Sequence, residues 1–297
     1  MKLQKKTSIP ASRRPRDDEI DVYGLTHTGR ARPNNQDHFL ICSLHKRIDV
    51  HHTSLPGMDR LPLETGRVAF LSMVADGVGG SARGEEASRI ALEAVTQYVA
   101  HSMNCYYTAD ASDDATFHHA LEQAAFQVHA EVTRNAAGDP ALAGMATTLT
   151  LFLGVWPRAY LLQVGDSRYY LFRDGQLMQV TRDQTLAQEL VDRGLVRPSD
   201  PAHQRFAHML SSSIGGPHTS PVVTTLQSAW DNVHLMCSDG LTRHISDDRI
   251  RDRLALMTSA KQVCEALLQD ALDGGGSDNI TIIVGRTVPK EDERGRL

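Results

Sequence analysis

The sequence predicts a fold of the α+β class, in which strands come first, two long helices follow, and strands return. Short apolar runs typical of strands occur on both sides of the segment 84–135, and within that segment apolar residues recur every three or four positions. An Asp174-Gly175 step separates two of the later strand-like runs, and this dipeptide is typical of a two-residue hairpin. Strands that are neighbours along the chain are therefore expected to form antiparallel pairs.

The first part of the chain is predicted to hold three strands. They are expected at residues 21–27, 37–42 and 66–75, where aliphatic, β-branched and aromatic residues gather. The segment 44–66 has no apolar period and contains two prolines and two glycines. We expect an inserted loop there.

Two consecutive amphipathic helices are predicted at residues 84–103 and 114–135. Each has apolar residues at a spacing of three and four, which places them on one face of a helix. These residues are Ala87, Ile90, Ala91, Ala94, Val95, Tyr98 and Val99 in the first helix, and Phe117, Leu121, Ala124, Ala125, Val128 and Val132 in the second.

The second half of the chain is predicted to begin with an antiparallel meander and to end with helices and one last strand. The meander strands are expected at 147–155, 159–165, 168–173 and 176–181, and a short helix at 184–194 ends at Gly194. Residues 195–219, rich in proline and glycine, are expected to be irregular. Two strands near 221–226 and 231–237, helices near 247–257 and 260–272, and a strand at 279–285 complete the chain.

Charge and composition exclude several classes of protein. The formal net charge of −5 disfavours a general nucleic-acid binder, which needs a basic surface to displace counterions. The basic N-terminal segment lacks the apolar core of a signal peptide, and the longest apolar-leaning run, 145–155, is far shorter than the roughly 20 residues of a membrane span. Four scattered cysteines without a C-x-x-C pair are typical of reduced thiols, so we expect a cytoplasmic protein.

The segment 74–88, VADGVGGSARGEEAS, places Asp76 between an apolar strand and a glycine-rich turn that precedes a helix. This order resembles a dinucleotide-binding fingerprint, but Asp76 would repel a pyrophosphate, and the helix leads to another helix instead of a second parallel strand. The alternative is that the segment presents carboxylate and carbonyl oxygens to a divalent cation. One aspartate in a turn is weak evidence for it, since Asp is a common turn residue.

Four other aspartates have the same context at the ends of predicted strands. They are Asp37, Asp166, Asp239 and Asp278. Each one taken singly is typical of a turn or cap. Five carboxylates at strand ends together favour a site for hard cations.

Six motifs in this order resemble those of the metal-dependent protein serine/threonine phosphatases of type 2C, the PPM family, in its bacterial branch. They are RPNNQD, VADGVGG, GMATTLTLFL, VGDSRYYLFRDGQ, CSDGL and SDNITIIV. The resemblance covers about residues 21–286 and implies one domain, a four-layer αββα sandwich of two antiparallel sheets flanked by helices. Residues 1–20 would then be a flexible basic tail and 287–297 a C-terminal tail.

The resemblance also implies a centre of two tightly bound Mg²⁺ or Mn²⁺ ions and a third, weaker one. Asp76 would bridge the two ions, the Gly77 carbonyl would bind one, and Asp239 and Asp278 would bind the other. Asp37 would lie in or just behind the ligand shell, Asp166 would bind the third ion, and Arg32 would hold the substrate phosphate.

The chemistry of phosphate esters explains these residue types independently. Two cations a few ångströms apart acidify a bridging water and neutralise the phosphate that it attacks. The planar guanidinium of arginine matches phosphate oxygens with two parallel hydrogen bonds. The sequence contains neither a Gly-x-Ser-x-Gly nor a Cys-x5-Arg phosphatase loop, and no covalent nucleophile is required.

Three positions depart from the family pattern. Val78 and Ser81 stand where many members carry a histidine, and Gln184 stands where Asp-His-Ser is usual. The general acid is therefore unassigned, with a metal-bound water as the expected donor. These departures motivate an alternative, a catalytically impaired phosphatase-fold signalling or binding module, and a two-metal nuclease or phosphodiesterase is a further rival.

The function expected from the sequence is hydrolysis of phosphoserine and phosphothreonine on proteins by a monomeric enzyme. Its partners would be phosphoproteins modified by a serine/threonine kinase, and the kinase itself. Neither nucleic acid nor membrane is expected as a partner. Substrate selectivity is expected in the long irregular segments 44–66 and 195–219.

Overall fold

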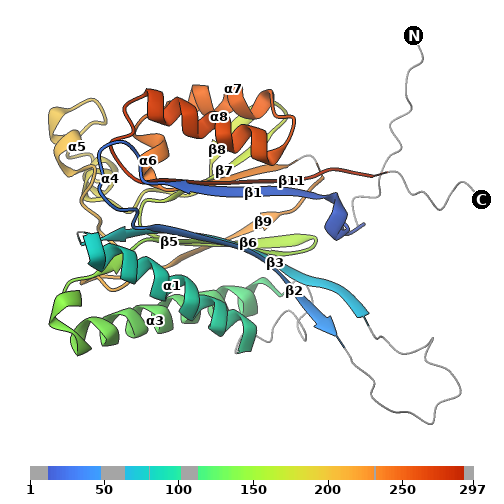
Figure 1. The fold of residues 1–297 in the computed structure, drawn as a ribbon, viewed down its shortest axis with the longest axis horizontal. Coiled ribbons are helices and arrows are strands. Elements are labelled where there is room, and N and C mark those ends of the chain that lie inside the picture. Colours follow the sequence, from blue (N-terminus) through green and yellow to red (C-terminus); the bar gives the residue numbers. More distant parts are fainter. Residues whose placement is uncertain (1–12, 48–63, 80, 102–112, 231, 291–297) are drawn as a thin grey trace, which may run out of the picture.

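The computed structural model describes residues 13–47, 64–79, 81–101, 113–230 and 232–290. Two antiparallel sheets lie face to face in the middle of the molecule, and helices cover the outer face of each (Figure 1). The α+β sandwich that the sequence predicts is confirmed.

The first sheet has the strand order β1-β11-β10-β7-β8, and every neighbouring pair is antiparallel. The Asp174-Gly175 step joins β7 to β8 as predicted, and both residues have positive φ, 51° and 77°, which a two-residue hairpin turn of this type requires. The strands of this sheet are β1 (Ile20–His27), β7 (Arg168–Arg173), β8 (Gln176–Gln179), β10 (Val233–Cys237) and β11 (Ile280–Thr287).

The second sheet has the order β2-β3-β5-β6-β9, and β4 pairs with the end of β3. Two of its strands are longer than predicted, because residues 44–47 and 64–66, expected in an inserted loop, continue the pairing of β2 with β3. The rest of that expected insertion, 48–63, lies outside the described residues. The strands are β2 (Asp37–Arg47), β3 (Glu64–Val78), β4 (Ala146–Thr147), β5 (Leu149–Val155), β6 (Arg158–Val164) and β9 (Val222–Gln227).

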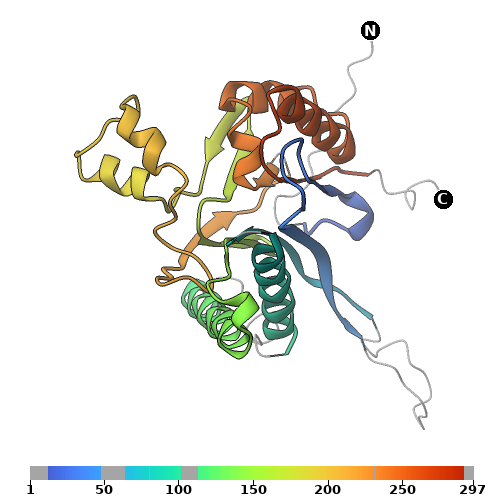
Figure 2. The same ribbon diagram turned by 60° about the vertical axis from the view of Figure 1, so that its left-hand side comes forward.

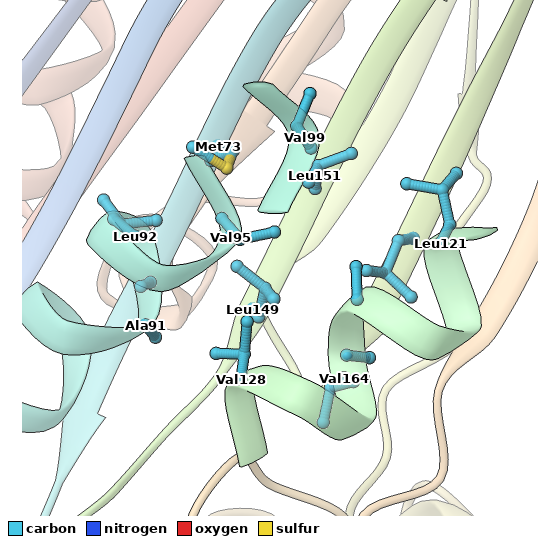
Figure 3. Close-up of a cluster of buried hydrophobic side chains, with 14 of the residues drawn as sticks. Met73, Ala91, Leu92, Val95, Val99, Leu121, Val128, Leu149, Leu151 and Val164 are labelled. Atoms are coloured by element: carbon cyan, nitrogen blue, oxygen red, sulfur yellow. The ribbon is translucent and has the colours of Figure 1, made fainter. Parts of the chain in front are cut away.

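Two long helices, α1 (Ser81–His101) and α3 (Asp114–Gly138), cover the outer face of the second sheet. The predicted apolar face of α3 is fully buried, and Ala91, Val95 and Val99 of α1 are fully buried with it. Figure 3 shows Val128 and Leu121 of α3 packed toward Leu149 and Leu151 of β5. The spacing of three and four therefore fixes which side of each helix meets the sheet.

The outer face of the first sheet is covered by α6 (Asp239–Thr242), α7 (Asp247–Ala255) and α8 (Ala260–Asp273). A separate apolar layer lies between the sheets and includes Val74, Phe152, Tyr169, Met236 and Ile283. No helix within the described residues is long and apolar enough to cross a membrane.

The segment after β8 projects from the sandwich and carries α4 (Leu186–Asp192) and α5 (Pro201–Phe206), drawn in yellow in Figure 2. The region 195–219 was expected to be irregular, and α5 is a correction to that expectation. Pro201 occupies the first position of α5, where a missing N–H is not needed. We call residues 186–219 the flap.

Chain segments near both ends contact the edge of the first sheet. The Glu19 carboxylate is fully buried and accepts hydrogen bonds from the Arg13 guanidinium at 2.7 and 2.9 Å. The backbone N–H of Val288 donates to the Glu19 carbonyl at 2.7 Å. Short 3₁₀ turns at Asp17–Glu19 and Pro140–Leu142 complete the described elements.

Candidate metal centre

A cleft of about 620 Å³ opens at the end of the sandwich where β3 and β10 end and where β2 and β11 begin. Six of the seven residues that the sequence singled out line it, namely Arg32, Asp76, Gly77, Asp166, Asp239 and Asp278. The seventh, Asp37, lies behind the cleft wall and is buried. The structure thus brings together residues from both sheets.

Asp76 lies within β3, which continues to Val78, and not in the turn where the sequence placed it. It is directly opposite Asp37 in the antiparallel register of β2 and β3. Like charges in this position destabilise a sheet, so the pair indicates a function that outweighs the cost. The backbone of Asp76 is held by Thr147, whose hydroxyl donates to the Asp76 carbonyl at 2.9 Å, and by Thr148, whose hydroxyl accepts from the Asp76 N–H at 3.0 Å.

Gly77 is required by packing between β3 and α1. A Cβ atom at this position would lie 2.1 Å from the Gly84 carbonyl oxygen and 2.8 Å from the Gln36 carbonyl oxygen. Glycine therefore lets the end of β3 touch the first turn of α1. The role of the Gly77 carbonyl as a metal ligand stays a prediction.

Asp37 links the two sheets through neutral hydroxyl groups. One of its oxygens, Oδ2, accepts hydrogen bonds from Ser238 Oγ and Thr281 Oγ1, both at 2.7 Å. Ser238 directly follows β10 and Thr281 lies in β11, and both of these strands belong to the first sheet. Asp37 begins β2 in the second sheet. The carboxylates of the cleft are thus fixed relative to one another by the sandwich itself.

Asn279 organises the loop that carries Arg32. Its side-chain amide donates to the Thr28 and Asn34 carbonyls, both at 2.9 Å, and its oxygen accepts from the Gln36 N–H at 2.9 Å. Asn279 belongs to the SDNITIIV motif, but in that motif only Asp278 was assigned a role from the sequence. The role of Asn279 follows only from the arrangement of backbone groups around it.

Asp166 lies on the link that crosses from β6 in one sheet to β7 in the other, and it is 7% exposed. Gln184 holds this link. Its side-chain oxygen accepts from the Gly165 N–H at 2.7 Å, and its amide donates to the Ser220 carbonyl at 2.8 Å in the segment that follows the flap. Gln184 is therefore a structural clamp beside Asp166, which explains a residue that the sequence marked as a departure.

The buried carboxylates of the cleft have raised pKa values. Burial raises the pKa of Asp37 to about 7, with repulsion from Asp239 and Asp278 adding to the shift. Burial and the surrounding aspartates also raise the pKa of Asp76 well above its usual range, and burial raises that of Asp166 in the same way. Each shift reports an unfavourable environment for negative charge, which a bound cation would relieve.

Two carboxylate oxygens in the described part of the chain are buried without a hydrogen-bond partner, Asp37 Oδ1 and Asp239 Oδ1. A buried polar atom without a partner is costly and rare in proteins. Hard divalent cations take such oxygens as ligands. The donor set therefore fits Mg²⁺ or Mn²⁺.

Two arginines face Asp239 and Asp278 across the cleft. Arg32 donates from Nε and Nη2 to the two oxygens of Asp278 at 2.8 and 2.9 Å. Arg243, the C-cap residue of α6, donates from Nη1 to Asp278 at 2.5 Å and from Nη2 to Asp239. Within the described residues, no three Asp, Glu, His or Cys side chains already converge on one metal position. Sequence reasoning missed Arg243, although its spacing of four from Asp239 was visible.

His208 also lines the cleft and comes from the flap. Burial raises the pKa of Asp239, and the charges of Arg243 and His208 act against that rise, which indicates that His208 lies near this carboxylate. Val78, at one position where a family histidine was expected, is 41% exposed at the rim. The side chain of Ser81 lies outside the described residues. No local sequence pattern could have identified His208, because the flap must fold back for it to reach the cleft.

The family model for Protein phosphatase 2C matches residues 51–275. The fold, the order of the aspartates and this match agree, and the chain belongs to the protein phosphatase 2C family. The resemblance inferred from the six motifs is confirmed.

The chain is similar to two named phosphatases and to a solved structure of one of them. The serine/threonine protein phosphatase PstP of Mycobacterium tuberculosis is 33% identical over 220 residues, which are 74% of this chain and 41% of that protein. Protein phosphatase PhpP of Streptococcus pneumoniae is 28% identical over 264 residues, 89% of this chain and 96% of that protein. A solved structure of the catalytic domain of PstP in complex with two manganese ions is 29% identical, has a TM-score of 0.70, and covers 91% of this chain and 99% of that chain. The chain thus spans less than half the length of the mycobacterial protein.

Proposed function

We propose that this chain hydrolyses phosphoserine and phosphothreonine on proteins, with two divalent cations, Mn²⁺ or Mg²⁺, in the cleft. The observation that carries the proposal is the cluster of buried carboxylates with raised pKa values and two unpartnered oxygens. Similar proteins named serine/threonine phosphatases, and one such structure in complex with two manganese ions, support it.

The carboxylates would divide the cations among them. Asp76, at the centre of the group, would be shared by both ions, the Gly77 carbonyl would bind one, and Asp239 and Asp278 the other. Asp37 would support the group from behind, and Asp166 would hold a third, weaker ion. Bound there, the two ions would lower the pKa of a water between them and neutralise the phosphate oxygens.

Arg32 would bind the substrate phosphate. Its loop is fixed by Asn279, and its guanidinium is at the mouth of the cleft with a side chain that is 52% exposed. A guanidinium offers phosphate two parallel hydrogen bonds with a fixed geometry. The same fork binds the Asp278 carboxylate, which has a geometry similar to that of phosphate.

His208 would donate the proton to the departing serine or threonine oxygen. An alkoxide is a poor leaving group, so a positioned acid accelerates its departure. Of the described residues that line the cleft, one is a histidine, and it is exposed to the solvent that would resupply the proton. This assignment replaces the metal-bound water as the first choice for the general acid.

Phosphoproteins made by a serine/threonine kinase, and the kinase itself, are the substrates that this activity would require. The flap stands at the rim of the cleft, through His208 and Leu210, and could distinguish among them. The alternative function, a catalytically impaired phosphatase-fold module, is less well supported than before. One of the three departures that suggested it, Gln184, is explained by its structural hydrogen bonds.

The proposal is tested with the purified chain and a phosphothreonine peptide. Chelation should abolish phosphate release, and added Mn²⁺ or Mg²⁺ should restore it. An unchanged rate in excess chelator would reject the metal-dependent mechanism, and no turnover with either metal would favour the impaired module. A phosphodiester such as bis-p-nitrophenyl phosphate serves as the control, because faster turnover of the diester would favour a nuclease or phosphodiesterase.

A further inference from the structure

Asp278 accepts hydrogen bonds at all of its acceptor positions. Oδ1 accepts from Arg32 Nε at 2.8 Å and from the Asn279 N–H at 2.9 Å. Oδ2 accepts from Arg32 Nη2 at 2.9 Å and from Arg243 Nη1 at 2.5 Å. A carboxylate has about four lone-pair positions, so a cation can bind Asp278 only if one of these donors leaves.

Arg243 connects the two acids that the proposed function assigns to one metal ion. Its guanidinium bonds Asp278 through Nη1 and Asp239 through Nη2, and its side chain is 27% exposed. Asp239 is the first residue of the short helix α6 and Arg243 is its C-cap, still with helical backbone angles, so the spacing of four presents the arginine to the acid. A positive charge already sits between the carboxylates on which a second positive charge would bind.

Arg243 and Arg32 differ in the carboxylates to which they donate hydrogen bonds. Arg32 donates two hydrogen bonds to Asp278, and its side chain is 52% exposed at the mouth of the cleft. Arg243 neutralises Asp239 and Asp278 together and is the less exposed of the two. Its removal would leave both acids with less compensation, because the one guanidinium bonds Asp239 and Asp278 together.

We propose that Arg243 is an internal competitor of the metal ion, which it keeps from binding too tightly. This inference rests on the proposed function, since it concerns the same Asp239–Asp278 pair. A divalent cation bound between Asp239 and Asp278 would compete with the guanidinium for their oxygens, so the energy of the ion pairs that it breaks is subtracted from the metal affinity. Metal occupancy would thereby respond to the concentration of free Mn²⁺ or Mg²⁺ instead of being permanent.

The test measures Mn²⁺ binding by isothermal titration calorimetry to chelator-stripped protein, without any substrate. Arg243→Met keeps the length of the side chain and removes its charge. It should bind Mn²⁺ about tenfold more tightly than the unaltered chain, which corresponds to a modest ion-pair energy. The matched control is Arg249→Met in α7, whose guanidinium bonds Asp270 at 2.8 Å and does not line the cleft. The control should bind Mn²⁺ with unchanged affinity.

A second readout is the thermal midpoint with and without Mn²⁺. The stripped Arg243→Met variant should melt below the unaltered chain, because Asp239 and Asp278 then repel each other, and Mn²⁺ should raise its midpoint by a larger increment. Equal or weaker Mn²⁺ affinity in Arg243→Met would overturn the inference while leaving the metal centre intact. If neither folded protein bound Mn²⁺, the metal centre, and with it the proposed function, would be rejected as well.

Discussion

Carboxylates inside the cleft and carboxylates outside it have pKa values shifted in opposite directions. At the edge of the first sheet, Glu19 accepts two hydrogen bonds from Arg13, and its pKa falls to about 2. On α8, Asp270 lies between Arg249 and Arg253, whose hydrogen bonds lower its pKa far below the usual range. In both places the charged form of the acid stabilises the fold.

In the cleft, Asp37 is as inaccessible to solvent as Glu19 but lies deeper in the molecule, and its pKa rises to about 7. Its hydrogen-bond donors, Ser238 and Thr281, are neutral, and repulsion from Asp239 and Asp278 adds to the effect of burial. The comparison teaches that the partner, and not burial alone, decides whether an acid supports the fold. The cleft acids are held in place at a cost in stability, which is typical of a functional site.

The largest expected effect is on turnover, which should depend on the carboxylates inside the cleft and not on those outside it. Asp76→Asn should lower kcat for a phosphothreonine peptide by about three orders of magnitude or more, because both metal ions would lose a charged ligand. Asp270→Asn should leave kcat nearly unchanged and lower the thermal midpoint instead, since it weakens the Arg249 and Arg253 pairs. Steady-state kinetics and thermal melts of both variants check this. Turnover at the level of the unaltered chain in Asp76→Asn would remove Asp76 from the centre.

The second effect concerns the proton given to the leaving group. His208→Gln should lower kcat for a phosphoserine peptide about a hundredfold, and lower it much less for p-nitrophenyl phosphate, whose leaving group needs no proton. His203→Gln, in the same flap but outside the residues that line the cleft, is the control. Equal losses on both substrates would show that His208 has a structural role only.

A smaller effect is expected at the phosphate-binding arginine. Arg32→Ala should raise KM for phosphopeptides about tenfold or more and weaken inhibition by inorganic phosphate, because the bidentate hydrogen bonds are lost. Arg30→Ala is the matched control, since Arg30 lies in the same loop but pairs with Asp273 on the surface. Kinetics of Arg32→Ala equal to those of the unaltered chain would exclude it from the site.

Much of the fold could be predicted because its periodic elements are long. The apolar spacing in 84–103 and 114–135 located both helices of the second sheet's outer layer, and the Asp174-Gly175 step located a hairpin. The ends of β2 and β3 were missed because pairing between the two strands extends them beyond the apolar part of the sequence. The helix α5 was missed because six residues are too few to show a period.

The acids of the site could be predicted because motifs carry them in order along the chain. His208 could not, since its position depends on the fold of the flap, and Arg243 was missed because its spacing of four from Asp239 has a meaning only if a helix forms there. The clamp made by Gln184 depends likewise on Gly165 and Ser220, which lie far from it in the sequence. Side chains whose role comes from tertiary contacts leave no local pattern.

The smallest expected effect is on stability against pH, measured in chelator, and it has opposite signs in the two regions. For Asp37 the pKa is about 7 in the folded state and about 4 in the unfolded state, so the folded state binds the proton more tightly. Its contribution to stability is present at low pH and is lost as the pH rises from about 4 through 7. For Glu19 the folded pKa of about 2 lies below the unfolded value of about 4, so its contribution is present above pH 4 and is lost as the pH falls toward 2.

Thermal midpoints between pH 3 and pH 8 should therefore distinguish the two acids. Asp37→Asn should gain a few degrees relative to the unaltered chain near pH 7, where the ionised Asp37 is most costly, and gain little near pH 4. Glu19→Gln should lose a few degrees at neutral pH, and this loss should shrink as the pH falls below 4, because the protonated Glu19 no longer attracts Arg13. If both variants shifted the midpoint in the same direction at pH 7, the contrast between the two regions would be wrong. In that case the carboxylates of the cleft would already be compensated by Arg32 and Arg243, and the Asp37 environment would be no more costly than that of Glu19.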